Sequence, residues 1–301
     1  MSIEEELKRV RDKEGSRAPA TTEEADEQDA REKRESQGGD SGPQVGTRFS
    51  AAEIHENIRK AADEEMRRPA GELVWSALGS GLLVGFTFLA VGFLEQFFPG
   101  DKRGIAAFLG YPLGFVFVVL ARHQLFTENT LEPVIPVLHR HDRKAFLRLG
   151  RLWGIVLPFN LLGALIFGIV VAQTQVVEPS VRESLNRVAM TSVSGGFGMV
   201  LYKAIWAGWL IASMAWMIAS TRETLAQIVL IWLTTGPIGA FGFKHSIAGA
   251  VEAFYRVWMG DMGFWDMMTS FELPCLVGNI IGGVVLVALV NHGQAGGGKS
   301  S

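Results

Sequence analysis

The residues best suited to chemistry in this sequence are Lys244 and His245, which stand side by side in the stretch FGFKHSIAG. They interrupt an otherwise apolar run from about Leu225 to Val257. An ionisable side chain at membrane depth costs about 2.5–3.5 kcal/mol on insertion scales, so it usually faces a cavity, a partner or a permeant. The pair therefore predicts a position for a small anion on a path through a membrane. The alternative is that His245 is a buried core residue that makes hydrogen bonds to its neighbours and has no role in transport.

The start of the chain has a different composition from the rest. Residues 1–70 are rich in Glu, Asp, Lys, Arg, Ser and Gly, and such a segment buries too little apolar surface to offset its chain entropy. We therefore predict a disordered acidic and polar tail over 1–49, and a second disordered tail over 292–301. Charges at helical spacing predict a polar cytoplasmic helix over 50–70, capped by Ser50. We favour the interpretation that these charges form a solvent-exposed face of the helix. The alternative is that the helix is a cytoplasmic plug or docking segment.

Composition also narrows the class of protein. The net charge of −3 gives no reason to expect a nucleic-acid partner. The single cysteine, Cys275, excludes an intrachain disulfide, and its apolar surroundings indicate packing. No secretory signal is expected, since residues 1–20 lack an apolar core. The sequence shows no nucleophile triad, metal-ligand spacing or phosphate-binding loop, so we expect neither an enzyme with catalytic residues nor a metal or other cofactor.

Residues 71–291 are predicted to form a membrane-embedded pore domain of six apolar regions. The second region, Ile105–Leu138, and the fifth, Thr224–Trp258, would make helices of about 51 Å, against a hydrocarbon core of about 30 Å. Polar residues interrupt them at 122–130 and 242–245, which predicts two half-helices in each. The other four regions have ordinary lengths and cover Leu73–Phe98, Leu152–Ala172, Gly195–Ala219 and Leu273–Asn291.

The two overlong regions occupy the same place in each triplet of spans. Because three is an odd number, the second triplet must cross the membrane in the opposite direction to the first. Interrupted segments at corresponding positions of inverted halves indicate a site at the midplane. The sequence therefore predicts an all-α membrane protein with two inverted three-helix repeats. Lys and Arg residues in the connector 139–151 favour placing it, and both termini, on the cytoplasmic side of the membrane.

The breaks themselves have predictable chemistry. A half-helix that begins near Ser246 would direct its positive N-terminal end toward the Lys-His pair and favour an anion there. His245 could then exchange a proton with a weak acid. Thr127 and Asn279 could line the path or only satisfy local backbone groups. Four further ionisable residues are possible charge partners, and we favour mutual neutralisation over direct substrate contact for them: Arg122, Glu128, Lys203 and Glu252.

Four stretches resemble motifs of the formate/nitrite transporter family, in order and at matching span positions. They are LFTENT at 125–130, NLLG at 160–163, FKHSIA at 243–248 and GNIIGG at 278–283. The resemblance covers about residues 70–291 and leaves the N-terminal tail outside. It implies an aquaporin-like protomer and a homopentamer with one pore per protomer. It also implies passage of small monovalent anions or their acids, such as formate, nitrite, lactate or hydrosulfide.

The resemblance implies a role for six residues of this sequence. They are the central histidine His245, the gating threonine Thr127, the constriction residues Leu125 and Phe126, the sixth-span pore asparagine Asn279 and the fourth-span lysine Lys203. We expect Ile238 to contribute to the constriction. Two positions depart from the family pattern, since Lys244 stands where Glu or Asn is usual and Gly208 where a pore asparagine is usual. Lys203 and Lys244 would then lie in the same region and repel each other. Either Glu128 or Glu252 neutralises part of this charge, or one lysine is uncharged, or the bound anion balances the charge.

Our leading hypothesis is an anion channel or proton-coupled carrier in the cytoplasmic membrane. The first alternative is a neutral-solute pore of aquaporin-like fold, which ranks lower because the Asn-Pro-Ala pair is absent. The second alternative is a non-transporting membrane scaffold whose N-terminal tail is the working part. Which anion is carried, and what neutralises Lys244, stay open at this stage.

Overall fold

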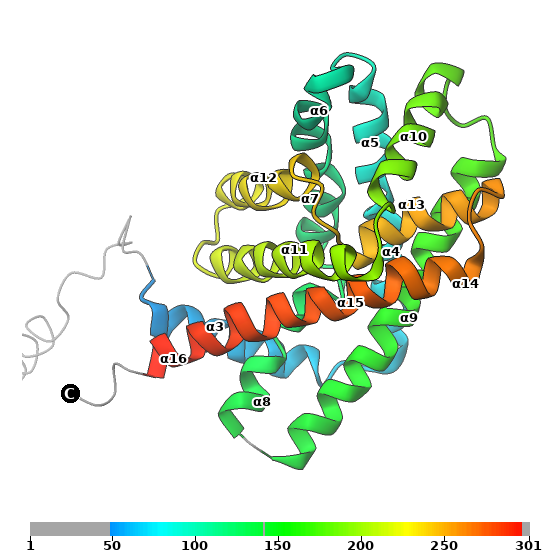
Figure 1. Ribbon diagram of the computed structural model, residues 1–301. Helices are drawn as coiled ribbons and strands as arrows, with labels where there is room; N and C mark the ends of the chain where they lie inside the picture. Colours follow the sequence, from blue (N-terminus) through cyan, green and yellow to red (C-terminus); the bar gives the residue numbers. More distant parts are fainter. Residues whose placement is uncertain (1–48, 141, 297–301) are drawn as a thin grey trace, which may run out of the picture. The chain divides into compact units, whose positions relative to one another are not determined.

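The computed structural model describes residues 49–140 and 142–296, and every element in these ranges is a helix (Figure 1). The predicted tails therefore lie outside the described residues, except for Phe49 and residues 292–296. Five helices in the described ranges are long and apolar enough to cross a membrane: Ala70–Glu95, Gly100–Leu120, Arg143–Gln173, Phe197–Ile218 and Phe264–Leu289. An apolar helix over Thr224–Ala240 is shorter than these. The predicted all-α membrane protein is confirmed.

The helices that follow α3 divide into two halves of the chain. The first half contains α4 (Ala70–Leu83), α5 (Gly85–Glu95), α6 (Arg103–Gly110), α7 (Pro112–Leu120), α8 (Val134–Arg140) and α9 (Arg143–Gln173). The second half contains α10 (Pro179–Ser192), α11 (Phe197–Ile218), α12 (Thr224–Ala240), α13 (Ser246–Met259), α14 (Phe264–Met267), α15 (Leu273–Ile280) and α16 (Val290–Gly296). Short π segments, Met268–Glu272 and Ile281–Leu289, join the last three.

The polar helix predicted after the tail is α3 (Ala51–Glu65), and Ser50 caps it as predicted. The Ser50 hydroxyl accepts the Glu53 amide, while the Glu53 carboxylate accepts the Ser50 amide, which is a complete capping box. A hydrogen bond from Arg59 lowers the pKa of Glu56 to about 2. The helix is not solvated on all sides, because Ile54 and other apolar residues of one face pack against α8 and the ends of α11 and α16. The charged residues lie on the opposite, more exposed side of α3, and a role as a plug or docking segment stays a prediction.

Several segments that the sequence analysis treated as a connector or a tail, or left unassigned, are helical. The basic connector 139–151 is not a separate element, since α9 begins at Arg143 and continues through the third span. The polar stretch after that span contains α10, which packs against α5 and α13. Residues 292–296, predicted as disordered, belong to α16. For α10 the cause is tertiary packing, because a short amphipathic helix gains most of its stability from the helices that it contacts.

Both predicted helix breaks are present. In the second apolar region α7 ends at Leu120, and in the fifth α12 ends at Ala240. After the fifth-region break the chain enters α13 directly at Ser246. After the second-region break it forms a 3-10 turn, Glu128–Thr130, and reaches the second half-helix, α8, only at Val134.

The same close crossing of helices occurs beside each break. At the crossing of α4 and α9, a Cβ on Gly163 would lie 2.5 Å from the Leu78 carbonyl oxygen. At the crossing of α11 and the last span, a Cβ on Gly282 would lie 2.6 Å from the Trp209 nitrogen. Small residues at these points let the backbones approach, as is usual in membrane helix packing. Each crossing brings an asparagine of the long span next to the break.

Candidate functional site

The two breaks have the same backbone path. Each contains one residue in the left-handed region, Arg122 with φ 55° and Gly242 with φ 63°. The amide of the following residue then donates to the carbonyl five residues earlier, at 3.0 Å in the first break and 2.9 Å in the second. Backbone groups beyond these points have no helical partner, and lipid cannot supply one.

Asn160, on α9, supplies those partners in the first break. Its Oδ1 accepts the Phe126 amide at 2.8 Å, while its Nδ2 donates to the carbonyls of Ala77 at 2.8 Å and Gln124 at 2.9 Å. The side chain is completely buried. The sequence analysis placed Asn160 in a family motif but did not predict it as a site residue. Its polarity inside a long apolar span was the available signal, because such residues are expensive unless they have a partner.

Asn279, at α15, makes three equivalent bonds, two to the second break and one to α11. Its Oδ1 accepts the Ser246 amide at 2.8 Å, and its Nδ2 donates to the carbonyls of Ala204 at 2.8 Å and Lys244 at 2.9 Å. The side chain is fully buried and faces the backbone of the break. A Cβ on Gly208 would lie 2.6 Å from the Asn279 Cα, so no asparagine fits at position 208. The two asparagines are therefore matched clamps, one for each break.

His245 occupies the position where the second break becomes α13. Its Nδ1 accepts the Ala248 amide at 3.1 Å, so the ring caps the helix. Its Nε2 lies 2.8 Å from the Thr127 hydroxyl, on the first break. A nitrogen that accepts a backbone N–H carries no proton, so the neutral ring carries its proton on Nε2 and donates to Thr127. To take up a proton at Nδ1, the ring would have to release the end of α13.

Aromatic packing holds the histidine in this place. The ring of Phe115, on α7, meets the His245 ring edge to face, with centroids 5.1 Å apart. The ring of Phe126 packs in the same way on Trp153 of α9, at 5.4 Å. Side chains of Thr127 and His245 are almost completely buried. The two breaks thus meet at one short hydrogen bond inside an apolar shell.

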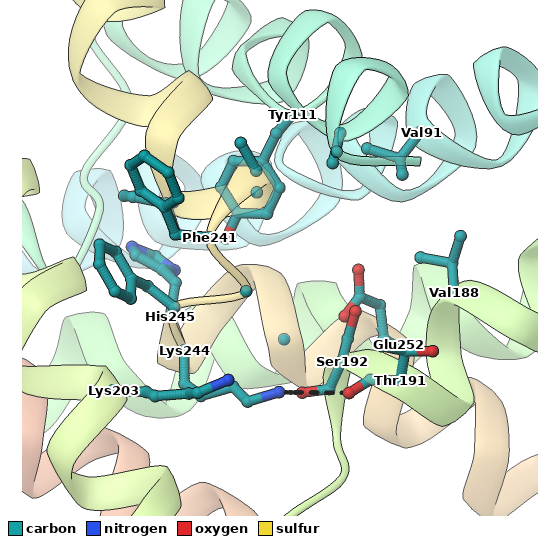
Figure 2. Close-up of a pocket in the computed structure, with 18 of the residues that line it drawn as sticks. Val91, Tyr111, Val188, Thr191, Ser192, Lys203, Phe241, Lys244, His245 and Glu252 are labelled. Atoms are coloured by element: carbon teal, nitrogen blue, oxygen red, sulfur yellow. Dashed lines mark hydrogen bonds between the residues drawn. The ribbon is translucent and has the colours of Figure 1, made fainter. Parts of the chain in front are cut away.

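A cavity of about 360 Å³, the first pocket, lies on one side of this contact (Figure 2). Figure 2 shows Lys203 and Lys244 along the lower edge, with His245 and Glu252 on opposite sides. The lysine pair predicted from the sequence is therefore brought together. Ile238 also lines the first pocket, as do Tyr111 of α6–α7 and the end of α10. The cavity combines cationic and apolar walls, as expected for a binding site of a small charged ligand.

The end of α10 supplies the partner of Lys244 that the sequence could not identify. The Lys244 ammonium donates to the carbonyls of Thr191, at 3.3 Å, and Ser192. The last carbonyls of a helix carry partial negative charge, so they offset part of the lysine charge. Glu252 lies near enough to interact with Lys244 electrostatically. Lys203 lies against Gly242, and within residues 49–140 and 142–296 its ammonium has no hydrogen bond or ion pair.

Ion pairs surround the outer part of the first pocket. The Glu95 carboxylate, at the end of α5, is 3.7 Å from the Arg103 side chain and 3.5 Å from that of Arg187 on α10. Glu95 and Arg103 line the pocket. The three residues connect α5, α6 and α10.

A second pocket of about 760 Å³ is formed by different parts of the same helices. It is lined by α3 residues such as Asn57 and Glu65, and by Arg122, Glu128 and Glu132. The possible charge partner Glu128 therefore lines a different pocket from Lys244. Among the described residues no ion pair joins any two of the four candidates Arg122, Glu128, Lys203 and Glu252.

The two pockets lie at opposite ends of shared helices. On α11, Lys203 lines the first pocket, whereas Ala215 lines the second, about 18 Å further along the helix. On α12 the order is reversed, with Gln227 in the second pocket and Ile238 in the first. Between them lie the break residues, where Leu125, Phe126 and Thr127 are buried. The arrangement is two cavities separated by a closed, mainly apolar barrier.

Comparison with known proteins identifies the family. Residues 52–293 match the formate/nitrite transporter family. The chain belongs to this family. Inner membrane protein YfdC of Escherichia coli (strain K12) is 36% identical over 245 residues, covering 81% of this chain and 78% of that protein. Uncharacterized transporter YrhG of Bacillus subtilis (strain 168) is 28% identical, covering 79% and 90%.

Solved structures agree on the fold of this formate/nitrite transporter family member. A pentameric formate channel with formate bound superposes with a TM-score of 0.61 at 21% identity, covering 77% of this chain and 96% of that chain. An FNT family ion channel superposes with a TM-score of 0.63 at 20% identity, covering 80% and 94%. The prediction of a transporter rather than an enzyme is confirmed by family membership. Roles of individual residues on the path stay predictions.

Proposed function

We propose that this protein is a transmembrane channel or proton-coupled transporter for small monovalent anions or their weak acids. The observation that carries the proposal is the first pocket, where the Lys203 ammonium has no described partner and the cavity ends at the His245–Thr127 contact. A cationic cavity with low-dielectric walls concentrates anions. Formate, nitrite, lactate and hydrosulfide are candidate substrates.

The proposed path joins the two pockets through the barrier. An anion attracted by Lys203 would pass Lys244 and His245, next to the N-terminus of α13, which favours negative charge. It would lose water at the constriction of Leu125, Phe126 and Ile238. The neutral His245 ring offers a donor there, and Thr127 accepts from it in the closed state. We propose Asn279 as the support of this path, through its bonds to the break.

We further propose six spans arranged as two inverted three-helix repeats of aquaporin-like type. The repeated clamps support this, because Asn160 and Asn279 bond corresponding atoms of the two breaks. The shorter α12 and the following α13 would together make the fifth span. A homopentamer is proposed because a formate channel of the same fold is pentameric.

The proposed location is the cytoplasmic (inner) membrane, with both termini and α3 on the cytoplasmic side. The relative YfdC is named an inner membrane protein, and basic residues at the start of α9, such as Arg143 and Lys144, support this orientation. The second pocket would then face the cytoplasm, and the first pocket the opposite side.

Flux into proteoliposomes tests the proposal, with formate, nitrite, hydrosulfide and glycerol as solutes. We expect anion flux above that of protein-free liposomes and an at least tenfold decrease in Lys203→Met, because the focusing charge is lost. Lys144→Met is the matched control, since Lys144 is exposed and outside both pockets. Glycerol flux alone would show a neutral-solute pore, and no flux of any solute would indicate a scaffold.

A further inference from the structure

We propose that Glu252 makes the first pocket selective for monoanions that carry their own hydrogen-bond donor. The class includes anions with an O–H next to the charged group, such as 2-hydroxy carboxylates. In this arrangement the anionic group faces Lys203, and the O–H donates to the Glu252 carboxylate. The inference rests on the proposed transport function and concerns the choice of substrate at that site.

The position of Glu252 follows from its place on α13. It is the seventh residue of α13, about two helical turns from the His245 cap. Glu252 lines the first pocket and is 4% exposed. Figure 2 shows its carboxylate beside Ser192, across the cavity from His245. A buried carboxylate therefore stands on the wall of a pocket whose floor is cationic.

The charges of the pocket are distributed unevenly. Lys244 is held by the carbonyls at the end of α10, and Glu95 is paired with Arg103 and Arg187. Among the described residues that line the pocket, this leaves Lys203 as the cation available to an anion. Ser192 is the polar residue beside Glu252 in the pocket. A carboxylate accepts several hydrogen bonds, so Glu252 retains acceptor capacity.

This carboxylate distinguishes two kinds of anion. A bare carboxylate such as acetate presents only negative charge and acceptors, so it is repelled by Glu252 at short range. A hydroxyl on the same molecule reverses the interaction, because an O–H donated to a carboxylate makes a strong charge-assisted hydrogen bond. A site that hydrogen-bonds a substrate hydroxyl rejects the analogue without that hydroxyl strongly. A site that discriminates only by the shape of its pocket does so far more weakly.

The test compares glycolate with acetate, which differ by one hydroxyl, in proteoliposomes of the full-length chain. We expect wild type to carry glycolate about tenfold faster than acetate after subtraction of the leak into protein-free liposomes. In Glu252→Gln the ratio should approach one, mainly through faster acetate flux. Glu252→Asp keeps the charge and should keep a preference for glycolate. Glu223→Gln, at an exposed acid outside both pockets, should not change the ratio.

The outcomes separate this inference from the function on which it rests. Equal glycolate and acetate flux in wild type overturns it, and this result does not depend on any variant folding. A ratio that persists in Glu252→Gln, with an unchanged elution volume in detergent, also overturns it. If formate and acetate enter as fast as glycolate, the result supports the proposed transport and contradicts the proposed selectivity. If no anion enters, the result contradicts both proposals.

Discussion

The two helix breaks share a backbone and differ in their side chains. Each has a left-handed residue, the same return hydrogen bond and an asparagine clamp with three bonds. Gln124 and Lys244 are equivalent, because each clamp donates to the carbonyl of one of them. The residues that follow are Leu125 in the first break and His245 in the second. The second alone leads straight into a long helix, α13. The comparison shows that one local scaffold supports an apolar barrier in one copy and cationic chemistry in the other.

The largest expected effect comes from removing a clamp. Asn160→Ala and Asn279→Ala each leave two buried backbone groups of a break unpaired, at about 1–3 kcal/mol per group, because the third bonded carbonyl lies inside a helix and keeps its helical partner. Since typical proteins are stable by about 5–15 kcal/mol, either variant should lose most of its folded protein. Thermal unfolding followed by size-exclusion chromatography in detergent measures this. Asn57→Ala on α3 is the control, and a clamp variant that melts like it would show that the two breaks do not depend on their asparagines.

An intermediate effect is expected at the left-handed residues. Gly242→Ala should destabilise the protein by about 1–2 kcal/mol through backbone strain alone, because the new Cβ would be at an ordinary 3.7 Å from Lys203. Arg122→Gly should instead stabilise the protein, since Arg122 already has a strained left-handed backbone that glycine adopts without strain. Melting temperatures measure both changes. Gly154→Ala, in an open position on α9, should be neutral or stabilising. If both variants changed the melting temperature in the same direction, the proposed match between the two breaks would be contradicted.

The smallest effect on stability is expected at His245, where the breaks differ most. His245→Leu makes the second break resemble the first and removes the helix cap, at about 1 kcal/mol. His245→Asn can still cap α13, so it should melt closer to wild type. Anion flux should decrease in both variants, because neither provides the Nε2 donor to Thr127. Wild-type flux in His245→Asn would show that the ring has only a structural role.

Features that depend on local sequence were predictable. The apolar lengths of the spans, the interruptions near Arg122 and Gly242, and the Ser50 cap all follow from short-range composition and periodicity. The grouping of Lys203 with Lys244 followed from the family resemblance, and the structure brings them into one pocket. These inferences need only the rise of a helix, the thickness of a bilayer and the cost of a buried charge.

Features that depend on distant parts of the chain were decided by the tertiary structure. The clamp of Asn160 on Phe126 joins α9 to the first break, and the bond from Lys244 to Ser192 joins the second break to the end of α10. Glu252, and not Glu128, shares the pocket with Lys244 because the helices place these acids in different cavities. Sequence spacing determined where the chain breaks. Helix packing determined which groups satisfy the breaks, because a freed backbone group takes its partner from whichever segment is nearest in space.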